Sequence, residues 1–313
     1  MRRFTFVAAM FLLAATSARA DGDRAFASVS TLDPAAHARL ESSIATARSR
    51  EPQLFDTVRN IVAHADDLDR RKEGRFYPMG ALLRGSTRGR TGAALALLEP
   101  VLDPQRFALP QSSSARIALR AGLVEAAGAT RDPAAAPVYR AILASGTELY
   151  ELRAAAEALG KLAIDADVAT LARLATTPGP KQDAVVAGLG SCRRVAAARA
   201  LAAVASQGKT GMAAKQLLRS LSAMGSAWAL ATPNAAPASE IAAIRDTTAR
   251  AAFAMFVSAP DTDVRNEATT ALEVIASPDA PAWIAAQKSG ASPELAAALD
   301  SLAQRLARAR RTP

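Results

Sequence analysis

The chain has 313 residues, a formal net charge of +9 and an aromatic content of 4%. Alanine occupies 79 positions, and alanine and leucine have high helix propensities, so the composition predicts an all-helical protein. The single cysteine, Cys192, excludes an intramolecular disulfide, and the stability of the fold must therefore come from core packing.

The first twenty residues have the three parts of a secretory signal peptide. Two arginines precede an apolar run from Phe4 to Ala15, and Ala18 and Ala20 place small side chains before the expected cleavage site. The run has 12 residues, whereas a helix that spans a bilayer needs roughly 20. We therefore expect cleavage after Ala20 and export to the periplasm or the medium, with no transmembrane segment left after cleavage.

The rest of the chain is expected to divide into four parts. Residues 21–31 are predicted to form a flexible N-terminus, 32–110 a helical segment with a basic loop, 111–290 repeated helix pairs, and 291–313 a capping helix with a basic tail. Four helix starts are indicated where a capping side chain precedes a proline, whose missing N–H costs nothing in the first helical turn. They are Asp33-Pro34, Asp132-Pro133, Ser277-Pro278 and Ser292-Pro293.

The basic loop is the strongest candidate for a binding site. Residues 68–92 contain seven cationic and two acidic side chains, and arginine forks bind phosphate or carboxylate groups bidentately. The candidate anion-binding patch consists of Arg70, Arg71, Arg75, Arg84, Arg88 and Arg90. The alternative is a solvated surface that only keeps the chain soluble. Stacking aromatics are sparse in this chain, so no nucleic-acid partner is predicted.

No constellation in the sequence predicts catalysis, a cofactor or a metal. Residues 85–91 superficially resemble a phosphate-binding loop, but the glycine spacing is one residue short and an arginine replaces the lysine. His64 lies beside Asp66, Asp67 and Asp69, yet a catalytic zinc site uses three protein ligands and the only other histidine is His37. We therefore predict that the chain is not an enzyme and has no catalytic, cofactor-binding or metal-binding residues.

Self-similarity is present between residues 111 and 290. The segment Leu152–Leu162 recurs in weaker form at 116–123, 194–201 and 264–272. The marker leucines are 36, 42 and 71 residues apart, at Leu123, Leu159, Leu201 and Leu272. A period of roughly 35–40 residues built from helix pairs is typical of an α-solenoid.

Two segments of this region resemble the repeat unit of a known family. Arg153–Leu162 and Asp132–Tyr139 are similar to the two halves of a bacterial HEAT-like unit, of the type also found in phycobilisome-lyase-like repeats. The resemblance covers about residues 112–290, is strongest at 148–176 and is poor at 234–260. It implies a right-handed α-solenoid of stacked antiparallel helix pairs, a HEAT-like or armadillo-type superhelix with a concave binding surface. It implies no bilin chemistry, because a shared fold does not transfer activity.

Two further features have alternative interpretations. Cys192 precedes two arginines at an expected helix start, where the thiol pKa could be lowered, but we expect a small buried side chain packed among alanines, with a reactive thiol as the alternative. The last helix carries Leu295, Leu299, Leu302 and Leu306 at helical spacing. This stripe is expected to dock on the preceding helix pair and close the solenoid, and a role at a membrane surface is the alternative.

Three functions are open on this basis. The first is an exported protein-interaction or scaffold module with a protein partner of unknown identity. The second is an adaptor that binds an anionic envelope surface through the basic patch and the C-terminal arginines, and this binding would weaken as the salt concentration rises. The third is an enzyme or a cofactor handler, which no motif supports.

Overall fold

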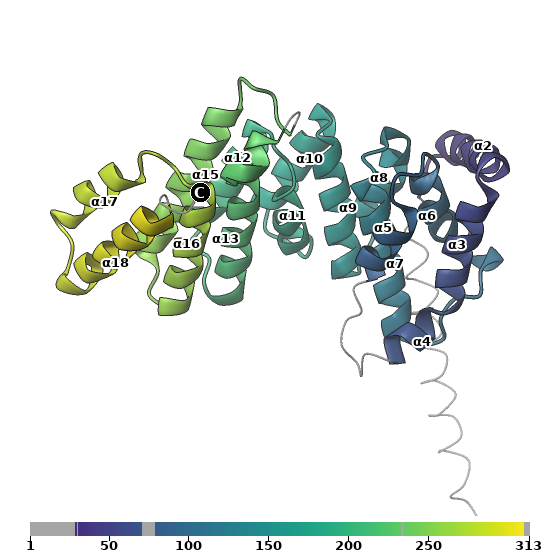
Figure 1. Cartoon of the computed structure of the whole chain (residues 1–313), viewed down its shortest axis with the longest axis horizontal. Helices are drawn as coiled ribbons and strands as arrows, with labels where there is room; N and C mark the ends of the chain where they lie inside the picture. The colour runs from purple at the N-terminus through teal and green to yellow at the C-terminus, as the bar shows by residue number, and fades with distance from the viewer. Residues whose placement is uncertain (1–28, 30, 71–78, 233–234, 310–313) are drawn as a thin grey trace, which may run out of the picture. The chain divides into compact units, whose positions relative to one another are not determined.

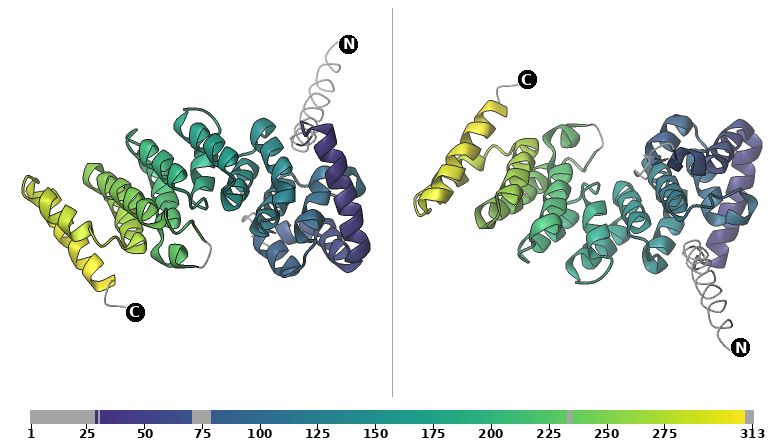
Figure 2. Two further views of the ribbon diagram at one scale, coloured as in Figure 1. Left: turned by 90° about the horizontal axis from the view of Figure 1, so that it is seen from above. Right: turned by 90° about the horizontal axis from the view of Figure 1, so that it is seen from below.

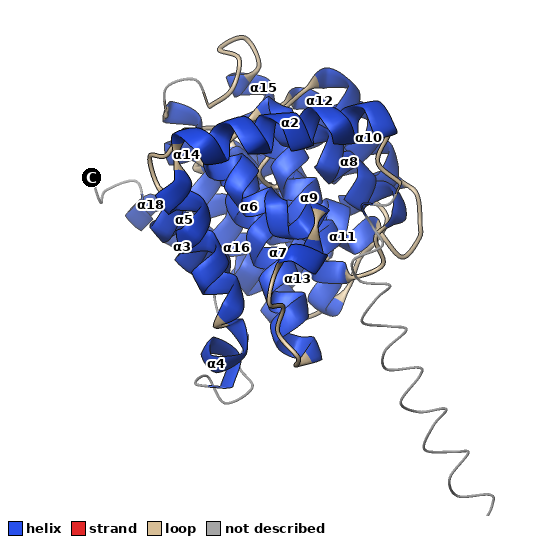
Figure 3. Cartoon of the chain, turned by 90° about the vertical axis from the view of Figure 1, so that its right-hand side faces the viewer, coloured by secondary structure: helices blue, strands red, loops and turns tan. Residues whose placement is uncertain are grey.

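The computed structural model describes residues 29, 31–70, 79–232 and 235–309. These residues form helices joined by turns and contain no β-strand (Figure 3), which confirms the all-α prediction. In the part of the chain so described, no helix is long and apolar enough to cross a membrane. The expected signal-peptide residues Ala18 and Ala20 lie outside it, as do Arg71 and Arg75.

The chain divides into two compact units, with the boundary after Ala158. This boundary lies inside the α-helix that runs from Leu149 to Leu162. The helices up to the boundary are α2 (Pro34–Arg50), α3 (Pro52–Ala63), α4 (Ala65–Arg70), α5 (Met79–Thr87), α6 (Ala93–Leu102), the 3₁₀ helix η2 (Pro104–Arg106), α7 (Ser113–Ala129), η3 (Pro133–Ala135), α8 (Ala136–Ser145) and α9 (Leu149–Leu162). After it come α10 (Asp165–Thr176), α11 (Gln182–Leu189), α12 (Val195–Ala205), α13 (Gly211–Gly225), α14 (Ala227–Ala231), α15 (Ile241–Ser258), α16 (Thr262–Ile275), α17 (Ala280–Lys288) and α18 (Pro293–Ala309).

Three of the four predicted helix starts are confirmed by their caps. The side chain of Asp33 accepts a hydrogen bond from the Ala36 N–H at 2.9 Å, and Asp132 accepts one from Ala134 N–H at 2.9 Å. Ser292 caps α18 by accepting from Leu295 N–H at 3.3 Å. Each cap satisfies a backbone donor that has no partner within the helix.

The fourth predicted start, Ser277-Pro278, is wrong. Helix α16 ends with Ala276 in the left-handed conformation, at φ 51°. The chain then needs several residues to turn, and α17 begins only at Ala280. Left-handed residues also follow α7 and α9, at Arg131 (φ 56°) and Ala163 (φ 53°). A left-handed residue that ends a helix is commonly glycine, so the absence of glycine hid these turns in the sequence.

In the N-terminal unit, α7 packs against both α5 and α6, and α6 also contacts α2 and α3 (Figure 1). The approach of α5 to α7 is close enough to require glycine. A Cβ atom on Gly122 would lie 2.8 Å from the backbone nitrogen of Gly80. The backbones of the two helices therefore meet without a side chain between them.

In the C-terminal unit, the helices form two rows of successive neighbours (Figure 2). Helices α10, α12 and α15 follow one another in one row, and α11, α13, α16 and α18 in the other. Segment 194–201 belongs to α12 and segment 264–272 to α16. These segments therefore lie in different rows, and the prediction that they are equivalent parts of one repeat is wrong. Both rows bury leucines, among them Leu201 and Leu272, so the leucine pattern cannot distinguish them.

Four glycines near helix ends recur at a regular spacing. Gly128, Gly160, Gly190 and Gly225 are 32, 30 and 35 residues apart. A Cβ atom would lie 2.5 Å from the Ala158 Cβ if placed on Gly128, 3.2 Å from the Cys192 Cβ if placed on Gly160, and 3.0 Å from the Ser220 Cα if placed on Gly190. On Gly225 it would overlap the Thr248 hydroxyl. Gly128, Gly160 and Gly190 thus admit the backbone of a neighbouring segment, and Gly225 admits the side chain of Thr248.

The docking of the last helix is confirmed. Leu299, Leu302 and Leu306 of α18 are buried, and the helix packs on α16 and α17. Leu295 is half-buried at the beginning of the same stripe. The apolar face of α18 is therefore largely used within the C-terminal unit.

The contact at Gly128 leads to a stability prediction. We expect Gly128→Ala to lower the free energy of unfolding by about 1–3 kcal/mol, because the new methyl group overpacks the contact with Ala158. The matched control is Gly85→Ala in α5, where a Cβ atom would meet nothing within 4 Å. This change should stabilise the helix by up to about 1 kcal/mol. Urea unfolding followed by circular dichroism measures both changes, and equal effects would contradict the account of the contact.

Candidate functional site

The predicted basic patch is only partly assembled in the described residues. The backbone of Arg70 ends α4, its side chain is outside the described part, and Arg84, Arg88 and Arg90 lie in α5 and the turn that follows. These three arginines line an open cavity of about 540 Å³ together with Thr87 and Thr130. The cavity lies between α5, the turn after it and the C-terminal end of α7.

Two of these three arginines already have carboxylate partners. Arg84 forms an ion pair with Glu125 of α7. The Nε atom of Arg90 donates to the Glu51 carboxylate at 2.7 Å, and Gly92 N–H donates to the same carboxylate at 3.0 Å. The hydrogen bond from Arg90 and then that from Gly92 hold the pKa of Glu51 below its usual value. Arg88 is exposed, and of these three arginines it is the one whose charge is left for an external anion.

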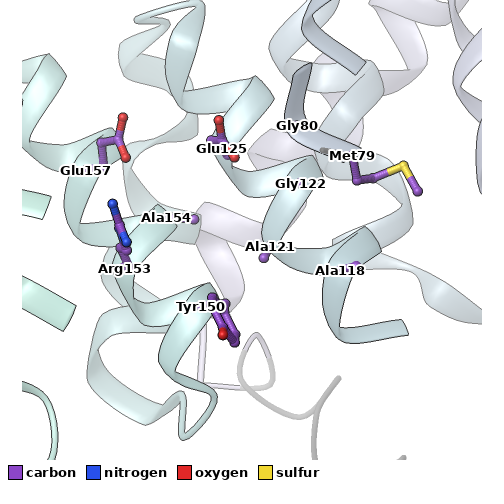
Figure 4. A pocket seen from close by; sticks show the side chains of 10 residues that line it. All are labelled: Met79, Gly80, Ala118, Ala121, Gly122, Glu125, Tyr150, Arg153, Ala154 and Glu157. Carbon is purple, nitrogen blue, oxygen red and sulfur yellow. The ribbon is translucent and has the colours of Figure 1, made fainter. Parts of the chain in front are cut away.

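A second cavity, of about 280 Å³, is lined by Glu125, the partner of Arg84, together with residues of α5, α7 and α9. Figure 4 shows Tyr150, Arg153 and Glu157 following one another along α9, opposite Ala118, Ala121 and Gly122 of α7. Its volume is at the lower limit for ligand cavities, which is roughly 300 Å³. Its walls carry both signs of charge and no nucleophilic side chain paired with a base, so the arrangement supports no specific catalytic step.

An ion pair is fully buried between the same two helices. Arg120 of α7 and Glu151 of α9 form a salt bridge, and their side chains are 2% and 3% exposed. Burial lowers the pKa of Arg120, and the charge of Glu151 opposes this shift. A buried pair contributes little net stability, but the loss of one partner leaves an uncompensated charge in the core.

We expect Glu151→Gln to lower the free energy of unfolding by about 3–5 kcal/mol, because the buried charge of Arg120 then loses its buried carboxylate partner. The double variant Arg120→Met/Glu151→Leu should recover most of this loss. Asp56→Asn is the matched control, since it breaks the ion pair of Asp56 with Arg59, whose side chains are 71% and 52% exposed. That change should cost less than about 1 kcal/mol. Urea unfolding of all variants measures the difference, and a small effect of Glu151→Gln would contradict the structural role of the pair.

The expectation that Cys192 is a small buried side chain is confirmed, and the alternative of a reactive thiol is wrong. Cys192 is fully buried, at 0% exposure, and precedes the first residue of α12 by three positions. Burial raises the pKa of its thiol to about 12, and the charges of Arg194 and Arg193 only partly offset this. Arg193 and Arg194 do act on the thiol, as their positions in the sequence suggest. The charge of Arg194, however, is already paired with Asp165 and Glu240.

We expect Cys192 in the folded protein to resist iodoacetamide at neutral pH and to react only when the C-terminal unit unfolds. Ser206→Cys in a Cys192→Ala background is the control, because Ser206 is exposed at the end of α12. Mass spectrometry of the alkylated protein measures both rates. Because the folded pKa is raised, the thiol favours the folded state below about pH 9 and this contribution is lost as the pH rises toward 12. Rapid labelling of native Cys192 would contradict its burial.

The acidic and histidine residues around α4 have structural roles. His64 follows α3 as its C-cap, with Nδ1 2.8 Å from the Asn60 carbonyl oxygen. The carboxylate of Asp66 accepts hydrogen bonds from the backbone N–H groups of Gln111 and Ser112, at 2.6 and 3.1 Å. The side chain of Asp69 lies outside the described part. Within the described ranges, no three His, Cys, Asp or Glu side chains are grouped to hold a metal ion.

Large apolar side chains on the surface were missed in the sequence. Trp228 of α14 is 82% exposed and Met212 of α13 is 69% exposed. Leu149 and Tyr150, at the beginning of α9, are each 48% exposed. The available signal was the rarity of aromatic residues, since the chain has only two tryptophans. Neither helix periodicity nor spacing indicates which of them is exposed.

Comparisons with known proteins give no relative from which a role could be transferred. No family model matches the chain, and no curated protein or solved structure matches it.

Proposed function

We propose that this chain is an exported protein-interaction scaffold whose helix pairs stack in the manner of a HEAT-like α-solenoid. The observation that carries the proposal is the exposure of large apolar side chains, with Trp228 foremost at 82%. Exposed tryptophan is costly in water and is enriched at protein interfaces. The two rows of helices in the C-terminal unit, and the glycines that recur every 30–35 residues, support the stacked-repeat part of the proposal.

The anionic-surface adaptor is the second candidate, and one observation favours it. Arg88 is exposed beside a cavity of about 540 Å³ that has threonine hydroxyls in its walls. The pairing of Arg84 with Glu125 and of Arg90 with Glu51 weighs against it. The scaffold therefore remains the leading proposal.

Affinity capture distinguishes the two candidates. Protein lacking residues 1–20 is immobilised and exposed to an envelope extract at low and high salt, beside the variants Trp228→Ser and Arg88→Ser. A scaffold should retain a defined protein at high salt and in Arg88→Ser, and should lose at least about tenfold in affinity in Trp228→Ser, since loss of an interface anchor costs about 2 kcal/mol. The captured protein is then purified and its binding remeasured directly. Capture that disappears at high salt and in Arg88→Ser would instead support the adaptor.

A further inference from the structure

The last helix pair, α17 and α18, has its own internal contacts (Figure 1). The two helices pack on each other, and Lys288 of α17 forms an ion pair with Asp300 of α18 at 2.5 Å. The main contact of the pair with the preceding helices is that of α18 with α16. Helix α17 faces α15 across an open groove of about 550 Å³, where the ring of Trp283 meets that of Phe253 at a centroid distance of 6.0 Å. The pair can therefore keep its internal contacts when it separates from the helices before it.

The chain enters this pair through a short, strained turn. Ala276, which follows α16, has φ 51° and ψ 44°, a left-handed conformation that is unfavourable for any residue with a Cβ atom. Helix α17 begins at Ala280, so the connection consists of residues 276–279. It contains Ser277-Pro278, and a residue before proline is biased towards an extended conformation. An extended connection would therefore release the strain that the turn stores.

Arg245 of α15 holds this turn in place. Its Nε donates to the carbonyl oxygen of Ile275 at 2.9 Å, and one of its terminal nitrogens donates to the carbonyl oxygen of Ala276. A strained backbone conformation persists only where the surrounding structure holds it. The guanidinium is therefore a clasp on the connection, and its release allows residues 276–279 to extend.

The surface that the pair covers is complementary to the pair itself. Helix α18 packs on α16 along a stripe of buried leucines. At the edge of this contact the Arg305 guanidinium donates two hydrogen bonds to the Glu273 carboxylate, at 2.9 and 2.6 Å. The same contacts can form whether α18 belongs to this chain or to a second copy of it. The partner that fits this surface is therefore the last helix pair of another molecule.

We propose that two copies of this chain dimerise by exchanging their last helix pairs. Residues 276–279 extend in each copy, and its α17 and α18 take the place on α16 of the other copy. The dimer regains the contacts of the closed monomer and loses the strain at both copies of Ala276, and short hinges under strain favour such an exchange. Association costs translational freedom, so the dimer forms at high protein concentration. The inference does not depend on the proposed scaffold function.

Cross-linking between two single-cysteine proteins gives a direct test. In a Cys192→Ala background, one protein carries Glu273→Cys on α16 and the other carries Arg305→Cys on α18. The two are incubated together at high concentration and treated with a short bis-maleimide cross-linker. We expect a covalent dimer, because exchange places position 273 of one copy beside position 305 of the other.

This product distinguishes exchange from other forms of association. In a closed monomer, or in a dimer that forms side by side, position 273 stays next to position 305 of the same chain and no covalent dimer results. Ser206→Cys in place of Glu273→Cys is the control for random cross-linking, because Ser206 is exposed at the end of α12. Absence of the product at every concentration, or an equal yield with Ser206→Cys, would overturn the inference.

Variants of the connection should shift the equilibrium in opposite directions. Ala276→Gly removes the strain of the closed turn and should raise the dissociation constant of the dimer at least about tenfold. Arg245→Gln opens the clasp and should lower this constant severalfold. Ala163→Gly is the matched control, because Ala163 is also left-handed, at φ 53°, but lies outside the connection.

Analytical ultracentrifugation measures the dissociation constants, and thermal unfolding verifies that each variant folds. Ala163→Gly should leave the dissociation constant unchanged. The same constant in Ala276→Gly as in the unaltered chain would contradict a dimer that forms by opening this turn.

Discussion

The close approach of helices at glycine and alanine is the constraint on which the rest of the structure depends. Gly128 admits Ala158 at a distance that leaves no room for a Cβ atom, and Gly190 admits Ser220 at a distance where a Cβ atom would have to displace its neighbour. A chain so poor in aromatic residues has few large side chains for a thick core. It gains burial instead by bringing backbones together, so that many small contacts accumulate dispersion energy.

The sequence predicts features that depend on neighbouring residues and misses features that depend on residues far apart in the chain. The caps at Asp33, Asp132 and Ser292 were found because capping involves residues within one turn. The all-α class followed from propensity summed over many residues. The row to which each helix belongs could not be read from leucines such as Leu201 and Leu272, because both rows bury them. Gly128 and Gly190 are visible in the sequence, but their role depends on partners 30 residues away, at Ala158 and Ser220.

Ion pairs account for two of the three arginines of the predicted basic patch whose side chains the structure describes. Arg84 and Arg90 find carboxylates 41 and 39 residues away, in elements that a count of local charge does not include. Similar pairs join two neighbouring helices of one row in the C-terminal unit, where Lys215 and Arg219 of α13 meet Asp263 and Glu267 of α16. The Lys215 bond lowers the pKa of Asp263. Exposed pairs of this kind add little stability, but their matching four-residue spacing fixes the register of the two helices.

Hydrogen exchange in a variant of one glycine contact tests the central claim most directly. Gly190→Leu places a side chain against the backbone of Ser220, between α11 and α13. If each helix depends mainly on its neighbours, mass spectrometry should show faster amide exchange in α11 and α13, while α17 and α18 keep the protection they have in the unaltered chain. Unchanged exchange in α11 and α13 would show that the helices do not meet at Gly190. An equal loss of protection in every helix of the C-terminal unit would contradict a fold held together by successive close contacts.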